Sequence, residues 1–169
     1  MPSLLLGCGN DRHKKVRIVS SQDWVGDLVT IDMNPHCGAD VVWNLEDRPL
    51  PFGDETFDEM AAYDVLEHIG RQGDWKGFFD EFAEYWRILK PGGLFGILVP
   101  VNGDALADIG HTRFFSPHYF RFLSQNWYAV QLSEGRAVTD YRWYWKRDFE
   151  TVALQDIDNH HIAVVLRKA

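Results

Sequence analysis

The stretch Leu4-Leu5-Leu6-Gly7-Cys8-Gly9-Asn10 decides the fold class, because it leads from an apolar run directly into a turn with two glycines. Residues 3–6 have the composition of a short buried strand. Gly7 and Gly9 lack a Cβ atom, so the backbone can turn sharply there and a ligand can approach it closely. Free N–H groups in such a turn can hold an anion such as a carboxylate. A purely structural turn explains the same residues, so the rest of the chain has to distinguish the two interpretations.

Further strand-like runs follow the glycine turn at regular intervals. They cover residues 28–32, 40–45, 57–63 and 94–101. Between the last two, aromatic and leucine residues recur every three or four positions over residues 78–89, which predicts an amphipathic helix ended by Pro91-Gly92-Gly93. A second helix is predicted to begin at Ser116-Pro117, a capping residue followed by proline. This alternation predicts an α/β fold with a mostly parallel sheet.

The C-terminal part of the chain predicts a hairpin. Residues 149–157 and 161–167 are strand-like, and the turn residues Asp158-Asn159 lie between them. Two strands joined by a tight turn must be antiparallel. The sequence therefore predicts one domain, residues 1–169, with a seven-stranded sheet that ends in an antiparallel hairpin. Only about 17 residues separate Asn10 from Leu28, so the first crossover helix is expected to be short or irregular, although residues 16–19 are strand-like.

Composition narrows the class of protein. A chain of 169 residues with 46% hydrophobic residues can build one sizeable core. The net charge of −8 makes binding of bulk duplex nucleic acid unexpected. No apolar run approaches the roughly 20 residues of a membrane span. Two cysteines do not make a disulfide framework, which favours a cytoplasmic protein.

Two strand ends carry polar residues suited to a nucleoside. Asp32 ends the second run, where a carboxylate can accept two hydrogen bonds from a ribose diol. Asn44 and Leu45 end the third run, where the amide can accept from an adenine amino group and the leucine can pack on the ring. The alternatives are a solvated turn acid and an asparagine that satisfies its local backbone.

In this combination the chain resembles the class I methyltransferases that use S-adenosylmethionine (SAM), of the small-molecule type. The matching segments are LLLGCGN, VTIDMNP, ADVVWNLEDRPLPFGDETFDEMAAYDVLEHI, YWRILKPGGLFGILVP and HTRFFSPHYF. They cover most of residues 3–122, in the order and spacing of the family. The resemblance implies a Rossmann-like methyltransferase domain with SAM as its cofactor.

The resemblance also implies which residues contact SAM. They are Gly7, Cys8, Gly9, Asp32, Met33, Asn44, Leu45 and Tyr63. The glycines would lie against the methionine part, Asp32 would take the ribose hydroxyls, and Met33 would lie beside the adenine. Tyr63 ends the fourth run, where the family's backbone faces the methionine amino group. The chain departs from the family at Asp11, which replaces a third glycine, and at Asn44, which replaces an aspartate but still supplies an acceptor.

Four residues after the fourth and fifth runs are candidates for the chemistry. They are Asp64, Glu67, His68 and His111. Loops that follow parallel strands share one edge of the sheet, so these side chains can converge. The pattern resembles methyltransferases acting on RNA 3′-terminal ribose and on catechol-like ubiquinone precursors, in which two acids and two histidines hold a divalent cation. Asp64 replaces the usual glutamate. Without a metal, Glu67 would favour a helix N-terminus and His68 would line the pocket.

The sequence thus predicts transfer of a methyl group from SAM to a hydroxyl (or an amine) of a small-molecule or saccharide-like acceptor. His68 or His111 is the candidate general base. A non-catalytic SAM-binding module and a metal-assisted ribose or catechol O-methyltransferase are alternatives. A nucleotide-dependent oxidoreductase is a further class, which the terminal hairpin disfavours.

Residues 141–145, with Trp127 and Tyr128, form an aromatic stretch before the hairpin. These rings either cap the substrate pocket and exclude water or pack without touching substrate. Arg113 and Arg142 are candidates for holding an anionic substrate, with a surface charge as the alternative.

Overall fold

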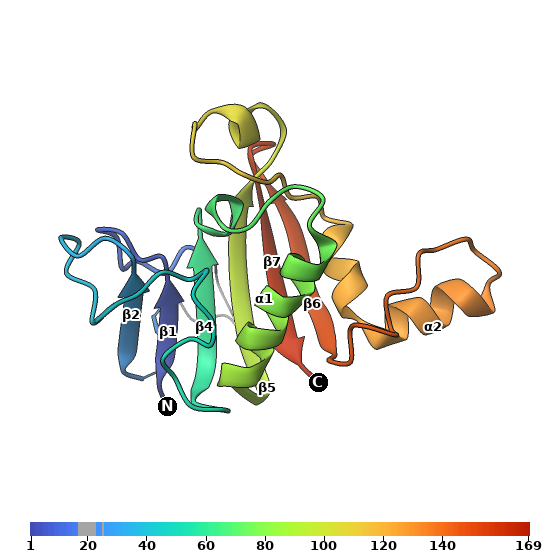
Figure 1. Ribbon diagram of the computed structural model, residues 1–169, viewed down its shortest axis with the longest axis horizontal. Coiled ribbons are helices and arrows are strands. Elements are labelled where there is room, and N and C mark those ends of the chain that lie inside the picture. The colour runs from blue at the N-terminus through green and yellow to red at the C-terminus, as the bar shows by residue number, and fades with distance from the viewer. Residues whose placement is uncertain (17–22, 25) are drawn as a thin grey trace.

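The computed structural model describes residues 1–16, 23–24 and 26–169. Within them the strands are β1 (Ser3–Leu6), β2 (Leu28–Asp32), β3 (Val41–Val42), β4 (Phe57–Tyr63), β5 (Leu89–Pro100), β6 (Phe149–Ile157) and β7 (His161–Lys168). The described strands form one seven-stranded sheet in the order β3-β2-β1-β4-β5-β7-β6 (Figure 1). The pairs from β3 to β5 are parallel, and β7 runs antiparallel to both β5 and β6. The predicted parallel sheet with a terminal hairpin is confirmed.

The register of the central strands brings three chain segments to one edge. Leu6 pairs with Ile31 of β2 and with Ala62 of β4. Because these strands are parallel and end at nearly the same level, the loops that follow them meet at one edge of the sheet. The glycine turn, the end of β2 and the segment after β4 are therefore neighbours.

Helix α1 (Trp75–Ile88) covers one face of the sheet, as Figure 1 shows. It begins earlier than predicted, because Asp74 is its N-cap and accepts a hydrogen bond from the Gly77 amide at 2.9 Å. Strand β5 begins at Leu89, directly after the helix. The helix therefore ends before Pro91-Gly92-Gly93, and these residues lie within β5, where its pairing with β4 shifts register between Leu89 and Leu94.

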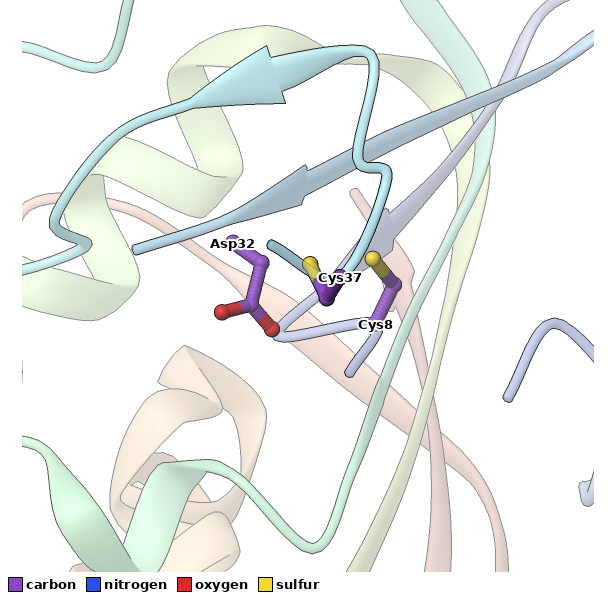
Figure 2. Close-up of side chains that lie close together, drawn as sticks. All are labelled: Cys8, Asp32 and Cys37. Atoms are coloured by element: carbon purple, nitrogen blue, oxygen red, sulfur yellow. The ribbon is translucent and has the colours of Figure 1, made fainter. Parts of the chain in front are cut away.

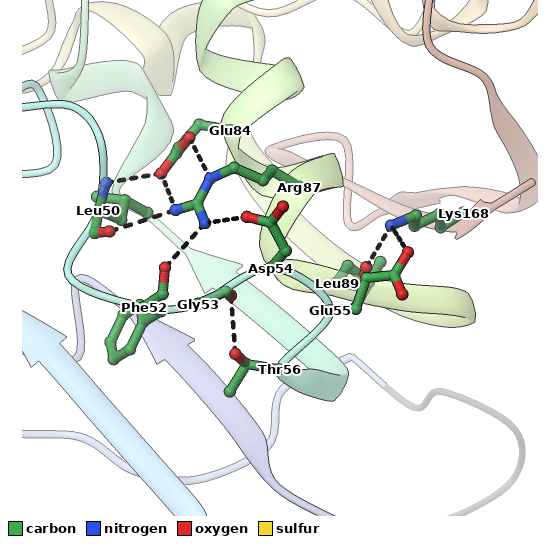
Figure 3. A network of polar contacts seen from close by, with 10 residues as sticks. All are labelled: Leu50, Phe52, Gly53, Asp54, Glu55, Thr56, Glu84, Arg87, Leu89 and Lys168. Carbon is green, nitrogen blue, oxygen red and sulfur yellow. Dashed lines mark hydrogen bonds and ion pairs between the residues drawn. The ribbon is translucent and has the colours of Figure 1, made fainter.

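Arg87, near the C-terminus of α1, forms hydrogen bonds with the segment that precedes β4 (Figure 3). Its Nη1 donates to the Phe52 carbonyl at 2.8 Å and to Asp54 Oδ1 at 2.7 Å. Glu84 Oε2 accepts a hydrogen bond from Arg87 Nε at 2.9 Å, and Glu84 Oε1 accepts from the Leu50 amide at 2.6 Å. The family-like segment PLPFGDETF (49–57) thus has a structural role, since it binds the helix to the sheet.

Two further predictions fail elsewhere in the fold. The third strand comprises only residues 41–42, so Asn44 and Leu45 lie in the loop beyond it. No α-helix begins at Ser116, whose Oγ instead accepts from the His118 amide within a local turn. A 3-10 turn (Tyr119–Leu123) follows, and α2 (Gln125–Ser133) begins after Ser124, whose Oγ caps the Trp127 amide. The cap of α2 is therefore Ser124 and not Ser116.

The prediction about the first crossover falls mostly on residues 17–22 and 25, which lie outside the described residues. The helices formed by the described part of the chain are all too short or too polar to cross a membrane.

Candidate active site

A cavity of about 280 Å³ lies where β1, β2 and β4 end. It is lined by Gly7, Asp32, Met33, Asn44, Leu45, Glu46, Val65, His68 and Ile69. Five of the eight residues predicted to contact SAM are in this lining, and Cys8, Gly9 and Tyr63 are not. Glu46, Val65 and Ile69 were missed by the sequence analysis, although each is next to or one residue away from a predicted site residue.

The glycine turn has the backbone conformation that its sequence requires. Gly7 and Gly9 have φ angles of +59° and +48°, in the left-handed region. A Cβ atom on Gly7 would overlap the side chain of Val65, whereas one on Gly9 would meet nothing within 4 Å. Gly7 therefore permits close packing against the segment after β4, and Gly9 borders open space.

Asp32 is held in a fixed orientation at the edge of this cavity. Its Oδ2 accepts from the Gly9 amide and its Oδ1 accepts from the Asn34 amide, both at 2.8 Å. Each carboxylate oxygen has further lone-pair capacity. The geometry leaves Asp32 able to accept from two neighbouring hydroxyl groups.

Met33 and residues 44–46 also line the cavity. Leu45 is buried, while Met33 is 68% exposed. Asn44 Oδ1 accepts from the Glu46 amide at 3.0 Å, as the local-backbone alternative predicts. That oxygen can accept a second hydrogen bond, so this contact leaves an adenine contact open.

Cys8 and Cys37 are buried free thiols beside Asp32, as Figure 2 shows. Their sulfur atoms and an Asp32 oxygen lie within 4.8 Å of one another. Cys37 Sγ donates to the Asn34 carbonyl at 3.1 Å, and burial raises the pKa of Cys8 to about 11. Arg12 bridges the two cysteine loops by donating to the carbonyls of Gly9 and Cys37, at 2.9 and 2.8 Å. The Cys8 side chain is therefore a buried packing group beside the glycine turn.

Tyr63 packs with the two cysteines in a small buried cluster. Burial raises the pKa of its phenol to about 12. Its side chain is therefore a neutral core group at the end of β4.

Glu67, His68 and His111 converge beside the cavity. Each offers a ligand atom, and these atoms lie within 4.8 Å of one another. The two imidazole rings meet edge to face with centroids 4.7 Å apart. Glu67 is 2% exposed, and neither of its carboxylate oxygens has a hydrogen-bond partner among the described residues. Burial is the main cause that raises the pKa of Glu67 to about 7, and the charge of Asp64 is a smaller contribution to this rise.

His111 has a defined tautomer. Its Nδ1 lies 3.0 Å from the Ala105 carbonyl, which can only accept, so Nδ1 carries the proton. In the neutral ring Nε2 is then an acceptor, and it lies 3.8 Å from Glu67 Oε1. This nitrogen can take a proton or bind a cation.

Asp64 is turned away from this group of three. It lies at φ +53°, and its carboxylate contacts Lys15 Nζ at 3.1 Å and His161 Nε2 at 3.4 Å. The four residues predicted to converge therefore separate into a group of three and one neighbour that acts through its charge.

Arg113 is buried and does not present a free charge. Its Nη1 and Nη2 each lie 2.8 Å from an oxygen of Glu81, and its Nε donates to the Leu66 carbonyl at 2.9 Å. The Thr112 amide donates to the Glu67 carbonyl at 2.9 Å. These contacts bind the His111 segment to the Glu67 segment. The sequence feature that could have predicted the burial of Arg113 is Glu81, an acid on the apolar face of α1. A buried carboxylate requires a buried partner.

Arg142 pairs with Asp140 on the surface, at 2.7 Å. Like Arg113, it already has an acidic partner and is a poor candidate for holding an anionic substrate.

Comparisons with known proteins agree with this geometry. A family described as "Methyltransferase domain" matches residues 4–97, more than half of the chain. A SAM-dependent methyltransferase from Archaeoglobus fulgidus is 13% identical, with a TM-score of 0.57 over 99% of this chain and 86% of that one. The N-methyltransferase NodS from Bradyrhizobium japonicum is 13% identical, with a TM-score of 0.53 over 99% and 85% of the chains. A structure of the Haloferax volcanii Trm112 methyltransferase activator in complex with a methyltransferase is 14% identical, with a TM-score of 0.57 over 99% and 82%. No curated protein sequence matches the chain.

Proposed function

The chain belongs to the methyltransferase domain family, and from this premise we propose that it transfers a methyl group from SAM to a hydroxyl (or an amine) of a small-molecule or saccharide-like acceptor. The observation that carries the proposal is the position of His68. It lines the cavity at the ends of β1 and β2 and also belongs to the group with Glu67 and His111. A nucleoside cleft and a set of acid–base side chains are thus contiguous.

The residues of the cleft fit the cofactor. Asp32 has lone pairs free for the ribose hydroxyls, Leu45 offers an apolar surface for the adenine, and Gly9 leaves open space beside the turn. When bound, SAM supplies a methyl group that its sulfonium has already activated. The protein's remaining tasks are alignment, exclusion of water and removal of a proton from the acceptor.

His111 is the best-placed base. Its Nε2 lone pair is available because Nδ1 donates to Ala105, so the proton of an acceptor hydroxyl can be held at Nε2. Glu67 Oε1 lies 3.8 Å from His111 Nε2. When the Glu67 carboxylate is ionised, its negative charge stabilises the imidazolium that forms once Nε2 has taken the proton. Arg113 is a positioning residue, because it fixes the segments that carry Glu67 and His111.

A metal-assisted ribose or catechol O-methyltransferase is the second candidate. One observation favours it: the two buried oxygens of Glu67, which accept no hydrogen bond from the described residues, lie close to two imidazoles. Buried carboxylates are normally satisfied, and a carboxylate with two histidines is a suitable ligand set for a divalent cation. A bound cation would lower the pKa of an acceptor hydroxyl.

Titration calorimetry and a labelling assay test the proposal together. The wild type should bind SAM and its demethylated product and should transfer labelled methyl from SAM to a component of a pooled metabolite extract. His111→Gln should keep cofactor affinity within about twofold and lose labelling at least about a hundredfold. Wild-type protein that binds SAM without labelling would indicate a non-catalytic binding module, and absence of SAM binding would refute the proposal.

Chelation separates the two candidate mechanisms. Loss of labelling in EDTA, restored by a divalent cation, supports the metal-assisted reaction. Labelling that EDTA leaves unchanged supports His111 as a base without metal.

A further inference from the structure

A second cavity, also of about 280 Å³, lies at the N-terminus of α1, apart from the cofactor cleft. Its walls are mainly aromatic and come from three regions of the chain. They include Trp75, Phe78, Phe115, Tyr119, Phe122 and Tyr141. Among the described residues, none lines both cavities. The aromatic stretch that the sequence singled out thus contributes Tyr141 to a cavity.

The rings form a continuous wall instead of a filled core. Trp75 and Tyr141 have centroids 5.0 Å apart, and Tyr141 and Phe122 have centroids 5.8 Å apart. Phe78 and Tyr119 close the wall at 6.4 Å. These five rings are only partly buried, so apolar surface remains uncovered in the cavity. Concave, mainly apolar sites of this size are typical of small-molecule binding.

One positively charged side chain at this cavity has no partner among the described residues. Arg71 is exposed in the lining, and its guanidinium makes no hydrogen bond or ion pair with them. The other charged groups there are engaged, since Arg113 pairs with Glu81 and Asp74 caps α1. In a chain of net charge −8, an unpaired arginine beside an aromatic cavity favours an anionic ligand.

Gly70 is the boundary between the two cavities. His68 and Ile69 line the cofactor cleft, whereas residues 71–75 line the aromatic cavity. The Gly70 amide donates to Glu46 Oε1 at 3.0 Å on the cleft side, and a Cβ on Gly70 would lie 3.6 Å from Arg113 on the other. Along the chain, a single residue without a side chain therefore separates the residues of the two linings.

We propose that the aromatic cavity holds the body of the methyl acceptor, which is an aromatic or other flat apolar molecule with an anionic group. This inference rests on the proposed function. The rings pack on the flat body, Arg71 pairs with the anionic group, and the nucleophilic atom reaches over Gly70 toward His68 and His111.

Two fluorescent probes test the cavity itself. Anilinonaphthalene sulfonate has an aromatic body with an anionic group, and N-phenyl-1-naphthylamine has the same rings without the charge. Arg71→Gln should weaken sulfonate binding about fivefold and leave the neutral probe unchanged. Arg121→Gln, at an exposed arginine outside both linings, is the matched control and should change neither. Equal effects of the two variants, or displacement of the sulfonate by the demethylated cofactor, would overturn the assignment.

A variant that fills the aromatic cavity tests whether this cavity is needed for methyl transfer. Thr139→Trp places a ring in the aromatic cavity from an exposed loop position, and Ala137→Trp, at an exposed loop position outside both linings, is its control. The Thr139→Trp variant should keep cofactor affinity and lose at least about tenfold in labelling of the extract, with the Ala137→Trp variant unaffected. The labelled product should be retained on an anion-exchange resin.

The outcomes separate the two proposals. Labelling by Thr139→Trp at the wild-type rate, or a labelled product that is not anionic, refutes the inference and leaves the proposed function standing. Wild-type protein that binds SAM and labels nothing refutes the proposed function, whatever the probes show.

Discussion

The Gly9 amide donates a 2.8 Å hydrogen bond to Asp32 Oδ2, which joins the turn after β1 to the acid at the end of β2. The two residues are 23 positions apart, and the parallel register of β1 and β2 brings them together. The bond fixes the carboxylate while leaving lone pairs free for a ligand. Changes at either residue should therefore affect cofactor binding more than folding.

Asp32→Asn should weaken binding of the demethylated cofactor by about ten- to a hundredfold, because an amide offers one acceptor oxygen and no charge. Titration calorimetry measures the effect. Asp47→Asn, at an exposed aspartate outside the cleft, is the control and should bind normally. Unchanged affinity of the Asp32 variant would exclude this carboxylate as the ribose ligand.

Gly7→Ala should destabilise the protein more than Gly9→Ala. Both substitutions place a Cβ at positive φ, which costs about 1 kcal/mol, but only the first also overlaps Val65. Urea unfolding should show a larger loss for Gly7→Ala, partly restored by adding Val65→Ala. Equal losses for the two alanine variants would show that contact with Val65 is not the constraint.

Glu67 should make the free energy of unfolding depend on pH. Its pKa is raised from 4.5 to about 7 in the folded protein, so the neutral carboxyl is favoured by folding. Its stabilising contribution is full below about pH 4.5, falls as the pH rises through about 7, and is lost above it, a change of about 3 kcal/mol.

Urea unfolding between pH 4.5 and 8.5 in EDTA measures this effect. The difference between wild type and Glu67→Gln should vary over that range, whereas the control Glu150→Gln, at an exposed acid, should follow the wild type. Parallel pH profiles of wild type and Glu67→Gln would contradict the raised pKa.

Arg113→Met should lower the free energy of unfolding by about 3 kcal/mol, because it leaves Glu81 buried without its partner. The double variant Arg113→Met with Glu81→Leu should recover much of that loss. Arg142→Gln breaks an exposed pair with Asp140 and should have little effect. A similarly small effect of Arg113→Met would show that the buried pair does not hold the fold.

The sequence was most informative where the signal is local. The glycine turn, the acid after the second strand and the periodicity of residues 78–89 each depend on neighbours within a few positions, and the structure contains the corresponding elements. An error arose at the start of the second helix. Ser116 has the residue type of a cap but only closes a local turn, whereas Ser124 caps α2.

By itself, the sequence determined which segments form most of the strands, the terminal hairpin and the edge of the sheet where polar residues gather, because strand periodicity and turn chemistry are properties of short segments. Only the tertiary structure decided that Arg113 is buried against Glu81, that Asp64 turns to Lys15, and that an aromatic cavity lies beyond Gly70. Burial and ion pairing depend on residues distant in the chain, so no local pattern specifies them.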